Sequence, residues 1–391
     1  MKIVYVLEYY YPHVGGVETL FQTVAEAMVK LGHSVVVYTS RLPNTLRNET
    51  RSGVRIIRLS VPPIGQRYFF TFFAPLFIWP AIRKADVVHT TTYNAAWPGW
   101  LVATVFRRPV VLSIQEVWID LWRMLPSMPW WSAWLHGLYE RFIYSLPYAR
   151  VVVGSQHTAE AVKRANPKYH PEVVYHGVAI PAADPTITRE TIRREWRTET
   201  TDFVLLYFGR PGWAKGIEIA VQGFALAIRE RPNLKFVLQL SKNPLDRYQQ
   251  IIHLLQELHL QEQVTIVPSC PRDQLASHIL AADTVIVPSL SEGFGFSAAE
   301  ACLLGQSVVV SQAASLPEVV SGRVVFFSPG DIRACAQAII AASQGQWLHL
   351  PRKTFPWENT IANFVRIYSE VIDRRPVTTM EANTGTTHRL K

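Results

Sequence analysis

The chain repeats one pattern along nearly its whole length: a short run of β-branched residues is followed by a longer stretch with helical periodicity. Strands that are apolar throughout are typical of parallel sheets that helices cover on both faces. Strands are predicted at residues 2–7, 34–39, 54–59, 86–90, 109–114, 150–155 and 172–176, and again at 202–209, 234–240, 263–268, 283–288, 306–311 and 323–328. This alternation predicts an α/β fold of βαβ units in doubly wound sheets.

One weakly periodic, proline-containing segment interrupts the pattern and predicts two Rossmann-like domains. The length of 391 residues fits two domains of ~100–200 residues each. The expected parts are a first domain, a linker, a second domain, a final helix and a disordered tail, at residues 1–176, 177–190, 191–356, 357–375 and 376–391. Open α/β sheets bind ligands beyond the carboxyl ends of their strands. We therefore expect the site in loops that follow strands, in a cleft between two facing domains.

The segment SLSEGFGFSAAEACLLG, residues 289–305, carries two carboxylates around a predicted helix start near Phe296. Glu292 precedes this helix, and Glu300 lies about one turn inside it. A carboxylate can accept two hydrogen bonds from vicinal sugar or ribose hydroxyls, and the first N–H groups of the helix favour an anion. Alternatively, Glu292 caps the helix and Glu300 lies on the surface. The small apolar neighbours of Glu300 instead indicate a buried side chain, which is costly for an unpaired carboxylate.

The E-x7-E spacing after a strand resembles that of the retaining GT-B glycosyltransferases of the family-4 type, also called glycosyl transferases group 1. Two further segments are similar to motifs of that family: YFGRPGWAKG at residues 207–216 and the glycine pair in YYYPHVGG at residues 9–16. The resemblance extends over about residues 2–330. It implies donor-binding roles for Gly15, Gly16, Gly209, Arg210, Lys215, Glu292, Gly293, Phe294, Gly295 and Glu300, and catalytic roles for Arg210, Lys215, Glu292 and Gln115. It also implies that the helix at 357–375 crosses back onto the first domain.

The chemistry of the implied site is that of a diphosphate and a sugar. Arg210 and Lys215 would hold the diphosphate and stabilise its charge as the glycosidic bond breaks; alternatively, they are two solvated cations of an ordinary loop. A glycine pair lets the backbone approach the donor phosphates, although glycine is also common in plain turns. The chain departs from the family at Gln115, where many members carry His, and at His176, where Asn is usual. Gln can hydrogen-bond a sugar hydroxyl but cannot share a proton as His does.

The implied function is transfer of a sugar from a nucleoside diphosphate sugar to a carbohydrate or lipid-linked acceptor, with retention of configuration. We expect no cofactor and no metal ion, because no Asp-x-Asp pair or histidine set with ligand spacing is visible. One alternative is a sugar-nucleotide epimerase or a phosphorylase on the same fold, and another is an inactive protein that kept the donor site. Residues 293–298 also match G-x-G-x-x-A, with Glu318 about twenty residues on. This match lies late in the second domain, and we interpret it as chance.

Positive charge and tryptophan gather in the first half of the chain. Residues 1–180 hold 18 Lys and Arg against 10 Asp and Glu, a net charge of +8 of the total +9, and 8 of the 12 tryptophans. Such a half suits an anionic partner, either nucleic acid or an anionic membrane surface. A lipid-linked acceptor favours the membrane, and no nucleic-acid partner is expected.

An aromatic segment in this half allows two interpretations. A helical stripe is expected to lie in the core; its members are Trp131, Trp134, Leu135, Leu138 and Phe142. A second group is hard to bury together and predicts an interfacial face; its members are Trp118, Trp122, Trp130, Arg123 and Arg141.

The N-terminal apolar run ends at Glu8, too early for the apolar region of a signal peptide. The longest uncharged apolar stretch, residues 68–82, is shorter than the ~20 residues that a membrane span needs. Three cysteines without paired spacing give no disulfide framework. We expect a cytoplasmic protein, with peripheral attachment to the inner face of the membrane as an open option.

Overall fold

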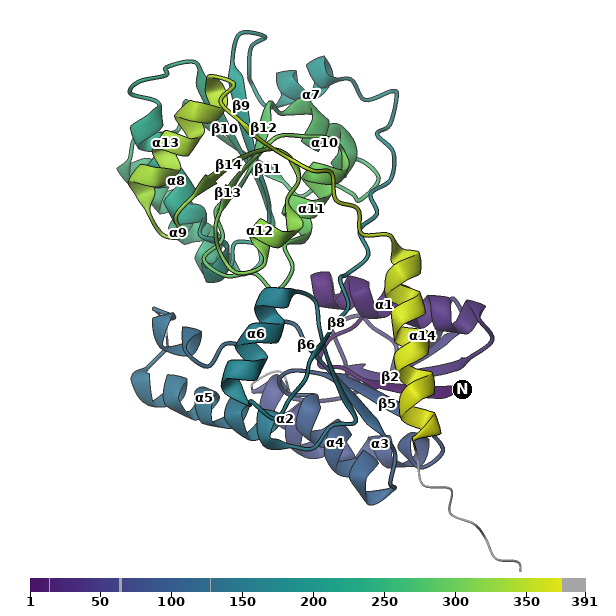
Figure 1. Ribbon diagram of the computed structural model, residues 1–391. Helices are drawn as coiled ribbons and strands as arrows, with labels where there is room; N and C mark the ends of the chain where they lie inside the picture. Colours follow the sequence, from purple (N-terminus) through teal and green to yellow (C-terminus); the bar gives the residue numbers. More distant parts are fainter. Residues whose placement is uncertain (14, 63–64, 127, 375–391) are drawn as a thin grey trace, which may run out of the picture.

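The computed structural model describes residues 1–374 except residues 14, 63–64 and 127, and it shows two α/β domains, one above the other (Figure 1). The first sheet has the order β3 (Asn48–Arg51), β4 (Val54–Leu59), β2 (Ser34–Ser40), β1 (Lys2–Val6), β5 (Val87–Thr91), β6 (Val110–Ile114), β7 (Arg150–Val153), β8 (Glu172–Val173). The second has the order β11 (Val264–Pro268), β10 (Leu234–Leu240), β9 (Phe203–Gly209), β12 (Thr284–Val287), β13 (Val308–Ser311), β14 (Gly322–Phe327), β15 (Leu348–Leu350). The predicted fold class of two doubly wound α/β domains is confirmed.

The sheets are mixed rather than purely parallel. All the predicted strands are present and pair in parallel, but the sequence pattern did not predict β3 and β15, which pair antiparallel with β4 and β14. Both are short edge strands, and both are mostly exposed. An edge strand of this kind needs no apolar run, so hydrophobic patterning cannot detect it.

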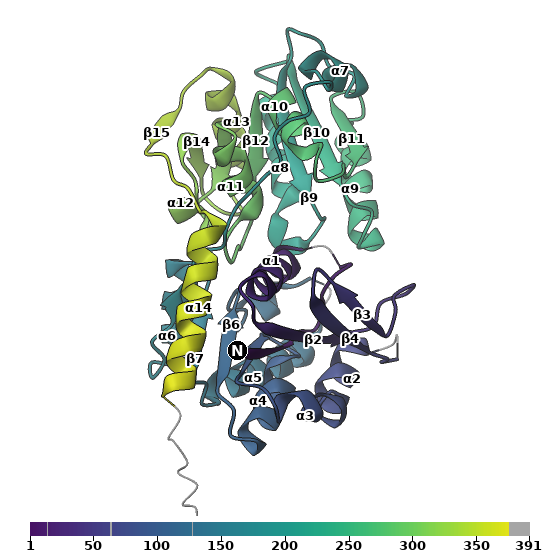
Figure 2. The same ribbon diagram turned by 90° about the vertical axis from the view of Figure 1, so that its right-hand side faces the viewer.

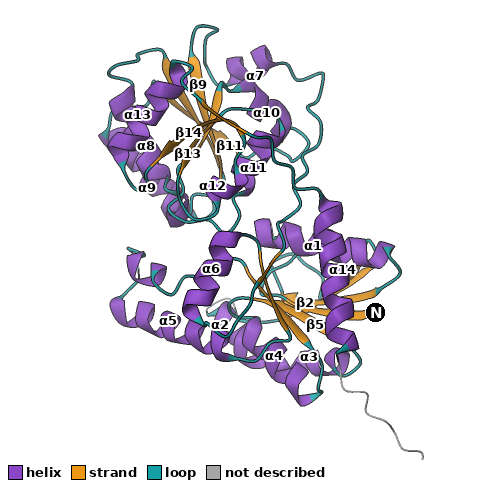
Figure 3. Ribbon diagram, in the orientation of Figure 1, coloured by secondary structure: helices purple, strands orange, loops and turns teal. Residues whose placement is uncertain are grey.

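Helices cover both faces of the first sheet (Figure 3). On β1, Ile3 and Tyr5 face one core, which contains α1 (Gly16–Lys30) and α14 (Trp357–Asp373). Val4 and Val6 face the opposite core. The helices on that side are α2 (Gln66–Phe73), α3 (Pro75–Ile82), α4 (Ala96–Val105), α5 (Trp130–Ser145) and α6 (Gln156–Ala165). The central strands β1, β5 and β6 are therefore buried on both faces, which explains their largely apolar sequences.

The second sheet is covered in the same way. On one side lie α8 (Ile217–Ala227), α9 (Leu245–Glu257) and α13 (Ile332–Ser343). On the other lie α7 (Arg189–Glu195), α10 (Leu275–Ala281), α11 (Phe296–Leu303) and α12 (Leu316–Val319). In each sheet the winding direction reverses between the first strand and one of its neighbours. The reversal lies between β1 and β5 in the first sheet and between β9 and β12 in the second. Ligand crevices form at these switch points because successive loops turn in opposite directions there.

The last helix, α14, lies along the first domain although it follows the second in the chain (Figure 2). Its residues Phe364, Ile367 and Tyr368 are buried against the core that contains α1. The Tyr368 hydroxyl lies 2.6 Å from Nδ1 of His89, whose Nε2 lies 2.8 Å from the Ser113 hydroxyl. Burial lowers the pKa of His89 to about 3, so this histidine is neutral. It links α14 to β6 through its hydrogen bonds with Tyr368 and Ser113. The expected tail at 376–391 and residue 375 of the final helix lie outside the described residues.

The expectation that the aromatic stripe of α5 is core was wrong. All five of its residues are exposed, with Trp131 at 54% and Trp134 at 52%. The buried side of α5 is formed by other residues, among them Ala133, Gly137 and Ile143. Both sides of the helix are thus apolar, and periodicity alone cannot tell which one packs. Among the described helices, none is long and apolar enough to cross a membrane.

Candidate active site

The loop after β9 carries the two predicted cations. Arg210 follows Gly209, the last residue of β9, and Lys215 ends a short 3-10 helix, Trp213–Lys215. The Leu290 amide donates to the Ala214 carbonyl at 2.7 Å and ties this loop to the loop that follows β12. Both loops leave the carboxyl edge of the second sheet at its switch point, where a ligand is expected.

Lys215 and Glu292 form an ion pair across these two loops. The Lys215 Nζ lies 2.6 Å from Glu292 Oε1, which also accepts from the Ser289 hydroxyl at 2.9 Å. The Lys215 side chain is 38% exposed. An ammonium has three donors, so Lys215 can hold Glu292 and still offer donors to a ligand. Arg210 is exposed and has no ion-pair partner among the described residues.

Glu300 is buried, as its small neighbours predicted, and it has a partner that the sequence pattern did not reveal. Arg272 donates to Glu300 Oε1 at 2.5 Å and to the Ala179 carbonyl at 2.6 Å. Burial raises the pKa of Glu300, and the adjacent Arg272 opposes that shift. Arg272 lies just before α10, 28 residues from Glu300, and no local motif marks it. One carboxylate oxygen of Glu300 is thus occupied, and the other remains for a ligand.

The predicted glycine pair lies against the second domain. A Cβ on Gly16 would lie 2.8 Å from the Phe296 ring, so only glycine lets the start of α1 approach α11 this closely. A Cβ on Gly15 would lie 3.1 Å from Nη2 of Arg210. The N-terminus of α1 therefore lies beside the cation loop, and both favour an anion such as a phosphate.

The remaining predicted residues continue the same surface. Gly293, Phe294 and Gly295 connect Glu292 to α11, and Gly295 has a left-handed backbone at the helix start. Phe294 is buried against the His176 ring, 5.1 Å away. Burial lowers the pKa of His176 to about 4, so this histidine is neutral and packs as an aromatic residue.

Gln115 follows β6 in the first domain and meets Gly293 across the cleft. The Cβ of any larger residue at Gly293 would lie 2.1 Å from the Gln115 carbonyl oxygen. The Gln115 side chain makes no hydrogen bond within the described part of the chain, so its amide is available to a ligand.

Gly293→Ala should lower turnover at least about tenfold, because the new methyl group collides with backbone and must push the domains apart, and misplacement by ~1 Å can cost far more. Each domain should remain folded, with little change in melting temperature. Gly137→Ala is a suitable control, since its nearest contact would be an ordinary 3.5 Å. Turnover within twofold of the parent for Gly293→Ala would show that the domains need not approach this closely.

Glu116 is a site residue that sequence reasoning missed. Its carboxylate accepts hydrogen bonds from the Ser291 hydroxyl of the second domain and, at 2.8 Å, from Nε1 of Trp118. Burial raises the pKa of Glu116; the Ser291 hydrogen bond opposes this shift, and the nearby charge of Glu292 adds to it. Its position just after β6 was the signal in the sequence, but the family motif falls on Gln115, one residue earlier.

A buried carboxylate fixes the loop that follows Glu116. Glu140 of α5 is fully buried and accepts from the Trp118 amide, from Nε1 of Trp122 and from the Tyr144 hydroxyl, at 2.7, 2.7 and 2.8 Å. Burial raises the pKa of Glu140, and these hydrogen bonds oppose the shift. Trp118 and Trp122, two of the tryptophans that the sequence suggested are hard to bury, are thus partly buried, and their indoles donate to Glu116 and Glu140, respectively.

Glu318 joins the domains on another side of the cleft. It accepts from the amides of Gln156 and His157 at the start of α6, at 2.9 and 3.0 Å, and from the Tyr175 hydroxyl at 3.0 Å. A carboxylate at a helix N-terminus is favourable. This contact gives Glu318 a structural role and supports the interpretation of the G-x-G-x-x-A match as chance.

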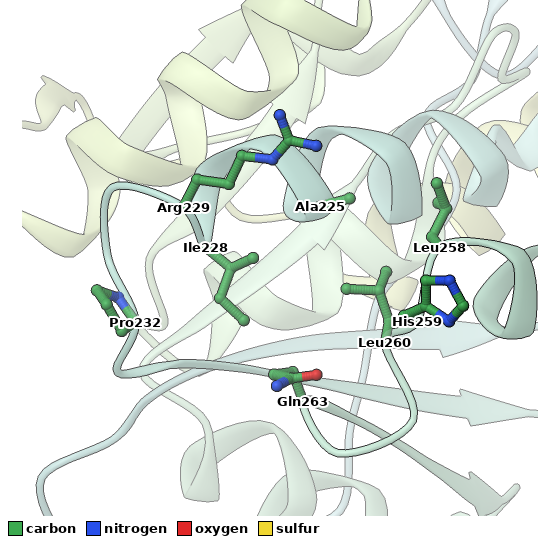
Figure 4. Close-up of a pocket in the computed structure, with 8 residues that line it drawn as sticks. All are labelled: Ala225, Ile228, Arg229, Pro232, Leu258, His259, Leu260 and Gln263. Atoms are coloured by element: carbon green, nitrogen blue, oxygen red, sulfur yellow. The ribbon is translucent and has the colours of Figure 1, made fainter.

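A hollow in the second domain is far from this surface. It has a volume of about 390 Å³, and Figure 4 shows its lining from the ends of α8 and α9 and the loops before β10 and β11. Those loops lie at the amino edge of the sheet, whereas all the predicted motifs lie at the carboxyl edge. The hollow therefore does not belong to the candidate site.

Both halves of the chain match known families. Residues 188–353 match glycosyl transferases group 1, and residues 14–180 match glycosyltransferase family 4. This chain belongs to the group 1, family-4 glycosyltransferases. An uncharacterised glycosyltransferase of Methanocaldococcus jannaschii is 28% identical, covering 83% of this chain and 84% of the relative. A D-inositol 3-phosphate glycosyltransferase of Thermobispora bispora is 24% identical, covering 92% and 91%.

Solved structures show the same GT-B architecture for this glycosyltransferase. Sucrose-phosphate synthase from Thermosynechococcus elongatus has a TM-score of 0.79 at 20% identity, covering 96% of this chain and all of that one. Anabaena HepE, solved with UDP and glucose, has a TM-score of 0.69 at 18% identity, covering 95% and 98%. At such identities the likeness establishes the fold alone, and the predicted GT-B fold is confirmed.

Proposed function

We propose that this glycosyltransferase moves a sugar from a nucleoside diphosphate sugar to a carbohydrate or lipid-linked acceptor, with retention at the anomeric carbon. The observation that carries the proposal is the meeting of the Arg210 and Lys215 loop with the start of α1, beside the carboxylates Glu292 and Glu300. Cations and a helix N-terminus suit a diphosphate, and carboxylates suit vicinal hydroxyls. HepE, which shares the fold, is described with UDP and with UDP-glucose, which supports a nucleotide-sugar donor.

In the proposed reaction, the bond between the anomeric carbon and the diphosphate oxygen breaks, and a bond to an acceptor oxygen forms on the same face of the sugar. Arg210 and Lys215 stabilise the negative charge that develops on the leaving diphosphate. A departing diphosphate oxygen takes the proton of the acceptor hydroxyl. The Gln115 amide, which lacks a partner within the described residues, binds a sugar hydroxyl.

The test is to incubate the protein with UDP-, GDP- and ADP-sugars, each with and without a lipid-linked saccharide or a free saccharide. Release of the nucleoside diphosphate together with a new glycosidic bond supports the proposal, and the anomeric coupling constant in the NMR spectrum of the product reports retention. An altered nucleotide sugar would indicate an epimerase, and a sugar phosphate made from a glycoside and phosphate would indicate a phosphorylase. Donor binding without release or transfer would indicate an inactive binding protein.

Activity should persist in excess EDTA, because we propose that Arg210 and Lys215 supply the positive charge that a divalent ion would otherwise provide. In the part of the chain that the structure describes, no group of three or more His, Cys, Asp or Glu residues could hold a metal ion. Turnover is measured before and after chelation and after dialysis against magnesium or manganese. Complete loss that either ion restores would contradict this expectation.

A further inference from the structure

The outer faces of α2 and α3 are apolar where a surface helix would normally be polar. Their inner side buries Phe70, Ala74, Ile78 and Ile82 at helical spacing against the first sheet. Their outer side exposes Tyr68, Phe69, Phe72, Phe73, Leu76, Phe77 and Trp79, with Phe72 at 66% and Leu76 at 65%. Water contact on this scale is unfavourable for apolar side chains, and a contiguous patch of this kind marks an interaction surface.

The outer side of α5 continues this surface. It exposes Trp130, Trp131, Trp134, Leu135, Leu138 and Phe142, with Trp130 at 80%. The Tyr68 hydroxyl of α2 lies 3.1 Å from Nε2 of His136 on α5, so the helices are in contact. Figures 1 and 2 place α2, α3 and α5 on the side of the first domain that points away from the second. These thirteen exposed side chains form one surface, which we name the α2–α3–α5 face.

The exposed charges around this face are predominantly positive. Exposed basic residues border it: Arg83, Lys84, Arg107, Arg123 and Arg141. None of these five has an ion-pair partner among the described residues. Residues 66–84, 96–108 and 121–146 contain one acidic residue, Glu140, and it is fully buried. The partner of this face must therefore be apolar at its centre and negatively charged at its edge.

A groove on the face places two of these cations beside apolar side chains. It has a volume of about 190 Å³ and is lined by Ile119, Asp120, Arg123, Ala133, Trp134, Gly137, Leu138 and Arg141. The two arginines outnumber the single carboxylate, Asp120. Arginine pairs bidentately with phosphate, and Trp favours the headgroup zone of a bilayer. The groove thus suits a lipid phosphate with apolar surface on either side.

We propose that the α2–α3–α5 face docks on an anionic lipid bilayer, with Arg123 and Arg141 holding lipid phosphates and the exposed aromatic side chains inserted at the headgroup level. A second copy of the chain suits the face less well, because a twofold interface would bring this basic surface against itself. Docking rests on the surface alone and requires no particular donor or reaction. The first domain would then lie between the bilayer and the second domain.

The experiment is co-sedimentation of the full chain with vesicles, without nucleotide. The parent should sediment with vesicles of phosphatidylglycerol and phosphatidylcholine at low salt, and much less with phosphatidylcholine alone or at high salt, since salt screens the attraction. Arg123→Gln with Arg141→Gln should lower the partition coefficient about twenty-five-fold, since each basic residue contributes about fivefold. Trp130→Ser with Trp134→Ser should lower it about tenfold or more.

The matched control is Lys30→Gln with Leu31→Ser, which removes one exposed cation and one exposed apolar residue at the end of α1, on the opposite face of the first sheet. Its partition coefficient should stay within twofold of the parent's. Release of nucleoside diphosphate from a sugar nucleotide, measured without vesicles, should be unchanged in all three variants, so a defect in docking is separable from a defect in the reaction. A parent that stays in the supernatant with anionic vesicles at low salt overturns the proposal, as does a dimer that the tryptophan substitutions dissociate.

Discussion

Lys215→Ala should lower turnover about a hundredfold or more, the scale observed when one positioned electrostatic group is removed from an active site. The Lys215 Nζ lies 2.6 Å from Glu292 Oε1, and the Lys215 side chain is still partly exposed. Its loss removes a positive charge from the proposed diphosphate position. It also leaves Glu292 as an uncompensated anion near Glu116, whose pKa is already raised by burial. Both effects oppose the build-up of charge on a leaving diphosphate. The measurement is the steady-state release of nucleoside diphosphate with a saturating donor.

Lys215→Arg keeps the charge and should retain most of the lost rate. Lys235→Ala is the matched control, because Lys235 lies on β10 and donates only to the exposed Glu262 carbonyl. Arg210→Ala should give a loss of similar size for the same electrostatic reason. Near-normal turnover in both Lys215→Ala and Arg210→Ala would contradict the assignment of this loop to the diphosphate.

Glu300→Ala should weaken donor binding about tenfold to a hundredfold. A hydrogen bond to a charged group contributes ~1.5–3 kcal/mol, and about 1.4 kcal/mol corresponds to a factor of ten in affinity. The structure leaves one carboxylate oxygen of Glu300 available beside the pair with Arg272. Isothermal titration calorimetry with the nucleoside diphosphate that is released in the assay measures the effect.

Arg272→Ala distinguishes a direct contact between Glu300 and the donor from a purely structural role of Glu300. If Glu300 acts only by anchoring Arg272 to the Ala179 carbonyl of the linker, both variants should lose affinity and melting temperature equally. If Glu300 contacts the donor, Glu300→Ala should lose more affinity than Arg272→Ala at a comparable melting temperature. A folded Glu300→Ala protein that binds the nucleotide as tightly as the parent would show that Glu300 is structural.

The sequence by itself determined the two-domain α/β fold and the edge of each sheet on which a site can lie. A strand buried on both faces must be apolar nearly throughout, so β1, β9 and β12 were evident from their apolar runs in the sequence. Because parallel strands end at the same edge, Arg210 after β9 and Glu292 after β12 had to be neighbours. The sequence alone therefore sufficed to place residues that directly follow a strand.

Only the tertiary structure decided which distant groups meet and which surfaces remain uncovered. Glu300 pairs with Arg272, and Glu116 accepts a hydrogen bond from Ser291 of the other domain. Such pairs depend on the packing of whole domains, and no spacing within one segment encodes them. The prediction that the aromatic stripe of α5 lies in the core was wrong for the same reason. Periodicity shows that a helix has apolar sides, but which side is buried depends on what the rest of the chain brings against it.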